Sequence, residues 1–349
     1  MMSAVVVAST VAGGPLGGVD GLDAIMRRGG RELRERMART ELHLEEVTAR
    51  GGAPLSSHAN ATITAGGKRL RPLLVVLAAE SAGGPPETAA GEERMVRAAV
   101  AVELVHSATL VHDDLIDGAQ LRRGHPTVAA VAGRELAIAT GDLLFSRAFA
   151  ELARNDDTAQ LRALSEASSA LAAGELLQRE DAYSSHVPVE RYLKRCELKT
   201  AALFEAACRL GALTAVGGSN GLAEALGAFA RRIGLAFQML DDVLDVSGPV
   251  ERTGKSRGRD LLDGTVTLPF ILARERDQEL ATFDLASLEC PQQAEALCDR
   301  IAATGALDEA REQALMVVAE AKAVLPAILP NGRSALLDMV ADAVVERYR

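Results

Sequence analysis

Two acidic motifs are the residues most clearly suited to chemistry. Asp113-Asp114-Leu115-Ile116-Asp117 and Asp241-Asp242-Val243-Leu244-Asp245 share the pattern DDhhD, where h is apolar. In a helix, residues four apart lie on one face, so the first and last aspartates of each motif point the same way. Both motifs fall in the last turns of a predicted helix, where negative charge costs about 0.3–1 kcal/mol per group. A divalent cation would reverse this penalty, and oxygen-only ligands indicate Mg²⁺ completed by substrate phosphates.

Basic residues lie near both motifs in the sequence. Lys68 and Arg71 precede Pro72, which suits a first helical turn and is expected to hold Arg71 outside the helix. The N–H groups and positive dipole at that helix end would add to the two cations and form an anion site. Arg122 and Arg123 follow the first motif in a turn, and Arg can bind phosphate through paired hydrogen bonds.

Two lysines extend this set of cations. Lys199 precedes Thr200 in an apolar helical stretch, where an unpaired Lys would be costly. Lys255 lies in a Gly- and Arg-rich loop after the second motif, and it matches a P-loop only superficially because no strand precedes it. Each cation alone is typical of a solvated surface. Together with the two acidic motifs and the apolar helices, they predict a substrate with a diphosphate head and an apolar tail.

The elements that must position these residues are helices. Glycine and proline clusters end the predicted helices, and no alternating strand pattern is present. We expect helices over residues 31–50, 72–82, 88–117, 128–155, 159–182, 189–215, 222–246, 267–276, 292–303, 308–325 and 332–348. Several are apolar nearly all round, as in a large bundle. The sequence predicts an all-α, single-domain bundle over residues 31–349, preceded by a disordered N-terminal tail over residues 1–30.

Composition and charge narrow the possible partners. The 349 residues include 38 basic and 48 acidic side chains, a net charge of −10 that argues against a nucleic-acid partner. No uncharged apolar run reaches the roughly 18 residues of a transmembrane segment. The apolar segment Ala4–Ala12 lacks the positive flank of a signal peptide. We therefore expect a cytoplasmic protein.

From about Gly66 to Pro269 the sequence resembles the trans-isoprenyl diphosphate synthases, the polyprenyl synthetases. The matching segments, in the family's order, are GGKRLRP, HSATLVHDDLIDGAQLRRGHPT, ATGD, GELLQ, KTA, FQMLDDVLD and GKSRGRDLLDGTVTLP. The resemblance implies a bundle of long helices around a deep central cavity, commonly a homodimer. It also implies condensation of isopentenyl diphosphate head-to-tail with an allylic diphosphate. Thr265 departs from a frequent family pattern, which has Lys there.

The resemblance further implies a role for each matching position. Two Mg²⁺ ions would be bound by Asp113 and Asp117 and a third by Asp241, with Asp114, Asp242 and Asp245 as supporting ligands. The allylic diphosphate would be held by Arg122, Lys199, Gln238 and Lys255. Isopentenyl diphosphate would be held by Lys68, Arg71, His106 and Arg123. Thr200 and Gln238 would orient the allylic cation, and they complete the catalytic set with Asp113, Asp117, Asp241 and Lys199.

The helix before the first motif is expected to form the cavity wall. Ala108 and Thr109 lie five and four residues before Asp113, where short-chain members often have aromatic residues, and Val105 lies further down the wall. From Ala101 to Asp113 the helix is about 18 Å long at roughly 1.5 Å per residue. The resemblance therefore implies a long-chain polyprenyl diphosphate of about C30–C50 at this depth.

Three alternatives stay open at this point. A short-chain farnesyl or geranylgeranyl diphosphate synthase would need an opposite helix to plug the cavity, and Phe145 and Phe149 are candidates. A class I terpene cyclase usually has a second motif rich in Asn, Ser or Thr and Glu, and lines its cavity with aromatic residues, which are scarce here. A non-catalytic subunit of a heteromeric synthase is expected to lose acidic motifs, whereas both are intact here.

Overall fold

The computed structural model describes residues 19–50, 52–184, 186–248, 257–329 and 332–346, which are largely helical. The all-α prediction is confirmed. The first half contains α1 (Val19–Arg28), α2 (Gly30–Ala49), α3 (Leu55–Thr64), α4 (Leu70–Ser81), α5 (Ala89–Ile116), β1 (Leu121–Arg122), β2 (His125–Pro126), α6 (Val128–Ala132), α7 (Arg134–Ala153) and α8 (Thr158–Asp181). The second half contains α9 (Val189–Cys196), a π-helical segment (Glu197–Ala201), α10 (Ala202–Thr214), α11 (Asn220–Ser247), α13 (Arg259–Leu262), α14 (Leu268–Arg276), α15 (Gln278–Ala281), a 3₁₀ turn (Leu285–Ser287), α16 (Pro291–Ala303), α17 (Ala306–Ile328) and α18 (Ala335–Glu346).

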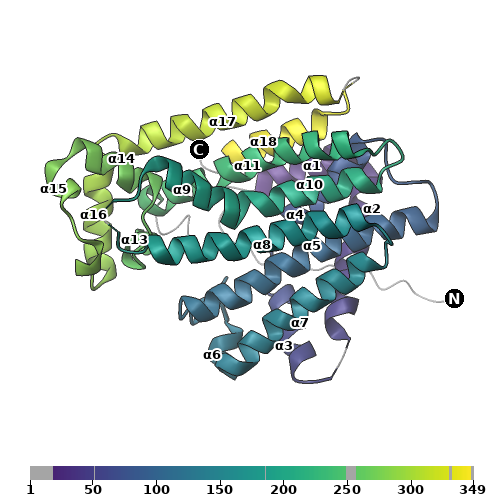
Figure 1. Cartoon of the computed structure of the whole chain (residues 1–349), viewed down its shortest axis with the longest axis horizontal. Helices are drawn as coiled ribbons and strands as arrows, with labels where there is room; N and C mark the ends of the chain where they lie inside the picture. Colours follow the sequence, from purple (N-terminus) through teal and green to yellow (C-terminus); the bar gives the residue numbers. More distant parts are fainter. Residues whose placement is uncertain (1–18, 51, 185, 249–256, 330–331, 347–349) are drawn as a thin grey trace.

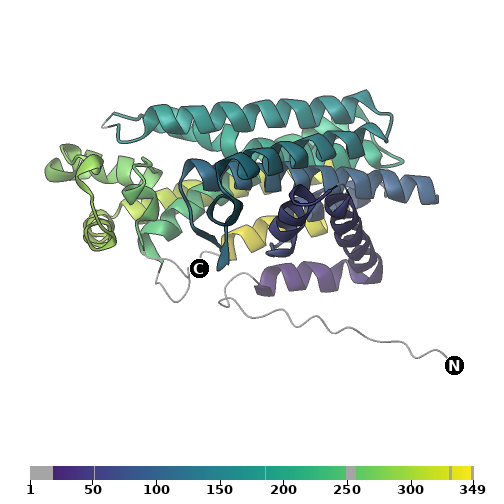
Figure 2. The ribbon, with the colours of Figure 1, turned by 90° about the horizontal axis from the view of Figure 1, so that it is seen from below.

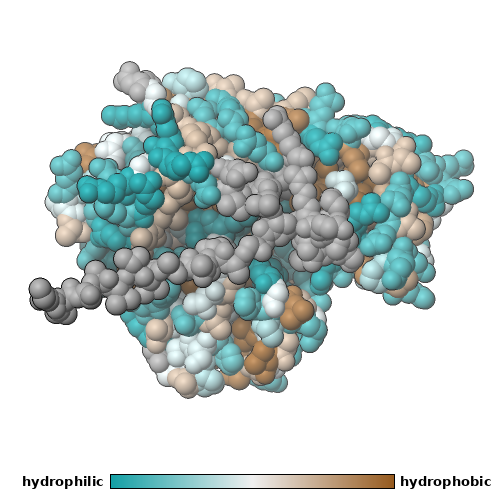
Figure 3. All heavy atoms as spheres, turned by 180° about the vertical axis from the view of Figure 1, so that it is seen from behind, coloured by the Kyte–Doolittle hydropathy of each residue, from teal (hydrophilic) through white to brown (hydrophobic). Residues whose placement is uncertain are grey.

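The long helices lie along the longest axis of the molecule. α5, α7, α8, α10 and α11 follow that axis, α17 lies along one side, and α13 to α16 gather at one end (Figure 1). Packed pairs include α5 with α7, α10 with α11, α11 with α17, and α4 with α10. The view from below shows the N-terminal helices on one side of the long helices (Figure 2). The face opposite to that of Figure 1 is mostly hydrophilic, with scattered apolar residues (Figure 3).

Helix α5 lies at the centre of the core. Its residues from Val100 to Val105 are all buried, and the acidic residue among them, Glu103, forms an ion pair with Arg69 at 3.0 Å. The helix is apolar nearly all round because it packs against α2, α4, α7, α8 and α10. By length and composition it could cross a membrane, but 72% of its apolar window is buried inside the protein. This burial is typical of a core helix.

The N-terminal prediction needs correction. Residues 19–28 form α1, although the sequence predicts a disordered tail over residues 1–30. Leu22, Ile25 and Met26 have the spacing of one helix face, and Ile25 is completely buried. This face is ordered by tertiary packing, because α1 lies against α18 and a Cβ at Gly21 would be 2.8 Å from the Cβ of Ala343. The rest of the predicted tail, residues 1–18, lies outside the described residues.

Three of the predicted helices differ locally in the structure. The helix expected over residues 128–155 is divided at Gly133, whose φ of 85° does not fit a helix. The helix expected over residues 189–215 contains the π-helical segment at its middle, a form that often occurs at functional sites. α4 begins at Leu70, so Arg71 is helical and is not held outside by Pro72. Proline is tolerated there because the first N–H groups of a helix have no partner within it.

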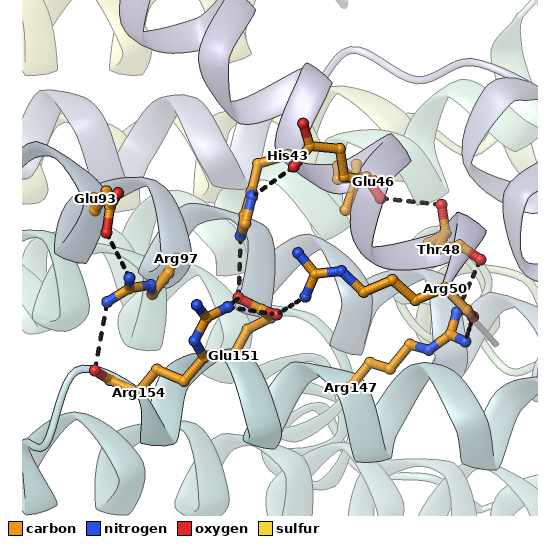
Figure 4. A network of polar contacts seen from close by, with 10 residues as sticks. His43, Glu46, Thr48, Arg50, Glu93, Arg97, Arg147, Glu151 and Arg154 are labelled. Atoms are coloured by element: carbon orange, nitrogen blue, oxygen red, sulfur yellow. Dashed lines mark hydrogen bonds and ion pairs between the residues drawn. The ribbon is translucent and has the colours of Figure 1, made fainter.

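A polar network fixes α2 to α7 (Figure 4). Glu151 of α7 is almost completely buried and accepts hydrogen bonds from His43 at 3.0 Å and from Arg50 at 2.8 Å. Burial alone would raise the pKa of Glu151, but the hydrogen bond with His43 and the charges of His43, Arg154 and Arg50 lower it below the ordinary value. The network holds the N-terminal helices against the helix that packs along α5.

Candidate active site

The first acidic motif lies at the C-terminal end of α5. Asp113 is in the last turn, and Asp117 caps the helix. Burial raises the pKa of Asp113 to about 6; Lys199 opposes this effect, whereas Glu175 and Asp117 add to it. Asp117 forms an ion pair with Arg179 of α8, whose Nε also donates to Glu175 at 2.9 Å. The helix end therefore presents carboxylates that repel each other and are partly balanced by cations from neighbouring segments.

Asp114, within the same motif, contacts the β1–β2 hairpin. Its side chain is 8% exposed, and its Oδ1 accepts a hydrogen bond from the Nε of Arg122 at 2.7 Å. Arg123 and Gly124 form the turn, with φ values of 53° and 81°, as a two-residue type I′ hairpin requires. The structure thus brings together two residues with separate predicted roles, in metal and in diphosphate binding. Their ion pair anchors the hairpin beside the first motif.

Helix α11 carries Gln238 and the second acidic motif. The Oδ1 of Asp242 accepts from the Nε2 of Gln238, and its Oδ2 accepts from the hydroxyl of Tyr192, each at 2.8 Å. Burial raises the pKa of Asp242, and the nearby charge of Asp260 adds to this effect. Asp241, one residue earlier, is rotated by about 100° around the helix axis and is half-buried. The two adjacent aspartates therefore face different surroundings.

Sequence reasoning missed Asp260, which belongs to this part of the site. Its backbone N–H donates to the Oδ2 of Asp245 at 3.2 Å. Burial raises the pKa of Asp245, and the negative charge of Asp260 raises it further. An acidic residue directly after a Gly- and Arg-rich loop is the signal that could have identified it. The predicted ligand in that loop, Lys255, lies outside the described residues.

Cations gather near the start of α4. Arg71 packs over Phe204, with its guanidinium carbon 5.0 Å from the ring centroid. Within the described part of the chain, its buried Nε has no hydrogen-bond partner. Burial lowers the pKa of Arg71 to about 10; Glu103 opposes the shift, and Arg123 reinforces it. Desolvated cations that repel each other are stabilised by a bound anion, so this cluster fits a diphosphate.

His106 and Arg123 belong to the same cluster. Burial and the charges of Arg71 and Arg123 hold the pKa of His106 well below its ordinary value, so the imidazole is neutral. Burial also lowers the pKa of Arg123. Gly67 allows Arg123 to approach, because a Cβ there would lie 2.8 Å from the Nη1 of Arg123. Lys68 follows Gly67 in the loop directly before α4.

The π-helical segment places Lys199 and Thr200 between α8 and α11. Lys199 forms an ion pair with Glu175 of α8. The Oγ1 of Thr200 donates to the Oε1 of Gln238 at 2.8 Å. α8 approaches this segment at Gly174, where a Cβ would be 2.6 Å from the backbone nitrogen of Lys199. Glycine is therefore required for α8 to lie against these two predicted catalytic residues.

The predicted chain-length residues lie on α5. Ala108 and Val105 are completely buried. Thr109 is half-buried, and its hydroxyl donates to the backbone oxygen of His106 at 2.7 Å. Phe145 and Phe149, the candidate plug residues, are half-buried on α7, which packs along α5. The aromatic side chains that are candidates to plug the cavity therefore lie on α7 rather than on α5.

The carboxylates fit a divalent cation that arrives with phosphates. All donors of the two motifs are oxygen, as Mg²⁺ prefers. Burial raises the pKa values of Asp113 and Asp245, and neighbouring carboxylates raise them further. Over the described ranges, no group of three or more His, Cys, Asp or Glu side chains is placed to hold a metal ion. Mg²⁺ commonly uses one or two carboxylates with waters and substrate phosphates, which agrees with this arrangement.

Comparisons with known proteins agree with this geometry. Residues 53–301 match the polyprenyl synthetase family model. The chain is 41% identical over 241 residues to component 2 of a heptaprenyl diphosphate synthase from Geobacillus stearothermophilus, covering 69% of this chain and 73% of that protein. It is 38% identical over 292 residues to a geranylgeranyl diphosphate synthase from Methanosarcina mazei, covering 82% and 87% of the two chains.

A solved structure shows the same likeness over nearly the whole chain. A polyprenyl synthase from Caulobacter crescentus, complexed with calcium and isoprenyl diphosphate, has a TM-score of 0.84 and 32% sequence identity to this protein. The match covers 96% of this chain and 100% of that one. The chain therefore belongs to the polyprenyl synthetase family and is a trans-prenyltransferase.

Proposed function

We propose that this enzyme is a Mg²⁺-dependent synthase that condenses isopentenyl diphosphate head-to-tail with an allylic diphosphate. The observation that supports this best is the pairing of two oxygen-only acidic motifs with a separate cation cluster around Arg71. The motifs suit one diphosphate with its divalent cations, and the cluster suits a second diphosphate. The relative from C. crescentus, complexed with calcium and isoprenyl diphosphate, supports a divalent cation at such a site.

The two diphosphates are bound by different sets of residues in this proposal. The allylic diphosphate is held by Arg122, Lys199, Gln238 and Lys255. Isopentenyl diphosphate is held by Lys68, Arg71, His106 and Arg123. Asp113, Asp117 and Asp241 would hold three Mg²⁺ ions, which would supply positive charge to the departing diphosphate.

The protein's own groups contribute orientation and exclusion of water. Lys199 is held by Glu175 of α8, from which it can turn to an incoming phosphate. Thr200 and Gln238, joined by a hydrogen bond, orient the allylic cation. The buried wall of α5 keeps water from that cation, because water would otherwise add to it. The proton lost after the new carbon–carbon bond forms passes to the departing diphosphate.

We propose a long-chain product of about C30–C50, since Ala108, Thr109 and Val105 are not aromatic and no Phe, Tyr or Trp occurs in α5 from Ala101 to Asp113, a length of about 18 Å. The relatives are named for both long and short products, since one is a component of a heptaprenyl diphosphate synthase and another is a geranylgeranyl diphosphate synthase. A short-chain product is the alternative, with Phe145 or Phe149 of α7 as the plug.

We propose further that the chain from α1 onward acts as one catalytic domain in a cytoplasmic homodimer. The Geobacillus stearothermophilus relative is named as one component of a synthase, so dependence on a second subunit is the alternative assembly. Light scattering of the purified chain gives the oligomeric state, and activity without any added protein decides between the two assemblies.

One incubation tests the reaction and the product length together. Purified protein is supplied with Mg²⁺, isopentenyl diphosphate and, in separate samples, dimethylallyl, geranyl, farnesyl or geranylgeranyl diphosphate. Mass spectrometry then reads the products, and a matched sample with chelator tests the metal requirement. We expect polyprenyl diphosphates of about C30–C50, the length that the α5 wall allows. Cyclic hydrocarbons would indicate a cyclase, and activity that persists with chelator would contradict the metal requirement.

A further inference from the structure

A chain of hydrogen bonds joins three helical elements at the candidate active site. The hydroxyl of Tyr192, on α9, donates to the Oδ2 of Asp242, and the Nε2 of Gln238 donates to its Oδ1, each at 2.8 Å. The Oγ1 of Thr200 then donates to the Oε1 of Gln238 at 2.8 Å. Tyr192 has no exposed surface, and Asp242 is 3% exposed. The proposed reaction assigns no step to Tyr192.

The types of these side chains determine which group donates and which accepts in each hydrogen bond. An ionised carboxylate can only accept hydrogen bonds, so Asp242 receives the tyrosine O–H and the amide NH₂. The amide oxygen of Gln238 is thereby turned toward Thr200, whose O–H donates to it. The lone pairs of the Thr200 oxygen stay available as acceptors, the polarity that suits a developing positive charge. An amide of Gln238 rotated by half a turn would place its oxygen against the Asp242 carboxylate and its NH₂ toward Thr200, whose hydroxyl would then accept instead of donate.

The ring of Tyr192 is held independently of its hydroxyl. The guanidinium carbon of Arg195 lies 5.3 Å from the ring centroid. Arg195 is 3% exposed, and its Nη2 donates to the backbone oxygen of Val266 at 2.6 Å. Removal of the hydroxyl alone therefore leaves the ring packed in place. The hydroxyl and the ring can be tested separately.

We propose that Tyr192 is a positioning residue for prenyl transfer: its hydroxyl holds Asp242, and through it Gln238, so that Thr200 keeps its acceptor orientation toward the allylic group. This inference rests on the proposed function. It also gives Asp242 an internal role that differs from the metal-binding role of its neighbour Asp241.

The first test is Tyr192→Phe, which removes one hydroxyl and keeps the ring. We expect kcat to fall about tenfold, equivalent to about 1.4 kcal/mol. The KM of isopentenyl diphosphate stays within about twofold, because its proposed ligands lie outside this series of hydrogen bonds. The matched control is Thr214→Val, which removes another buried hydroxyl, one that donates to the backbone oxygen of Gly211 at 2.7 Å outside this chain of bonds. Its kcat should equal that of the wild type.

A double variant separates positioning from general stabilisation. In a Gln238→Leu background the link to Thr200 is already broken, so Tyr192→Phe should change kcat by less than about twofold. An equal kcat for Tyr192→Phe and Thr214→Val overturns the inference, as does a tenfold loss that persists in the Gln238→Leu background. An active wild type with an unimpaired Tyr192→Phe overturns this inference alone. A wild type that is inactive with every primer overturns the proposed function, and this inference with it.

Discussion

A methyl group added at Gly174 tests how closely α8 must lie against the π-helical segment that carries Lys199 and Thr200. The Cβ of Gly174→Ala would be 2.6 Å from the backbone nitrogen and 2.9 Å from the Cα of Lys199, and ordinary contact begins at 3.4 Å. Backbone atoms cannot rotate away, so the two segments must separate by about 0.8 Å. Overpacking of this kind costs about 1–3 kcal/mol of stability. A displacement near 1 Å of reacting groups lowers turnover by about a hundredfold.

Turnover and thermal unfolding, measured on the same samples, give the loss of activity and the loss of stability. We expect Gly174→Ala to lower Tm by a few degrees and kcat by one to two decades, because Lys199 and Thr200 move relative to Gln238. Gly221→Ala is the matched control, because a Cβ at that position of α11 has no atom within 4 Å. Its Tm should be unchanged or higher, since alanine favours a helix over glycine. A Gly174→Ala enzyme with the kcat and Tm of the control would refute the argument.

Four further substitutions test the proposed metal site, the proposed cavity wall on α5 and the N-terminal helices. Asp113→Ala and Asp241→Ala should each lower turnover by several decades, at about 1.4 kcal/mol of barrier per decade, with unchanged circular dichroism; near-normal turnover at saturating Mg²⁺ would contradict the assignment. Ala108→Tyr should shorten the product to about C15–C20 by mass spectrometry, because extra atoms in filled space cost about 1–3 kcal/mol; a folded variant with the wild-type product length would place the cavity floor elsewhere. Glu151→Gln should lower Tm at pH 7. The folded pKa of Glu151 lies below its ordinary value, so its stabilisation is present above that value and is lost as the pH falls through the folded pKa. The difference in Tm between wild type and variant should therefore shrink below about pH 4.5, and a constant difference down to pH 3 would contradict this linkage.

Much of the site could be predicted because its signals are local. The DDhhD spacing places aspartates on one helix face wherever that helix lies, and Gly and Pro mark most helix ends. Such rules need no knowledge of neighbouring elements. They failed at α1, where packing against α18 decides the outcome. At Gly133 the local signal was present, because a glycine with a φ of 85° divides a helix that the prediction continued through it.

The sequence by itself determined the helical class, the positions of the acidic and basic motifs and the kind of ligand they suit, because periodicity and charge are properties of the chain. Only the tertiary structure decided which side chains face each other. It turned Asp114 toward Arg122 and Asp242 toward Tyr192, and it added Asp260 to the second motif. Each of these contacts joins different elements. Their partners are chosen by helix packing and by the need of buried polar groups for hydrogen bonds, and neither is visible in a single segment.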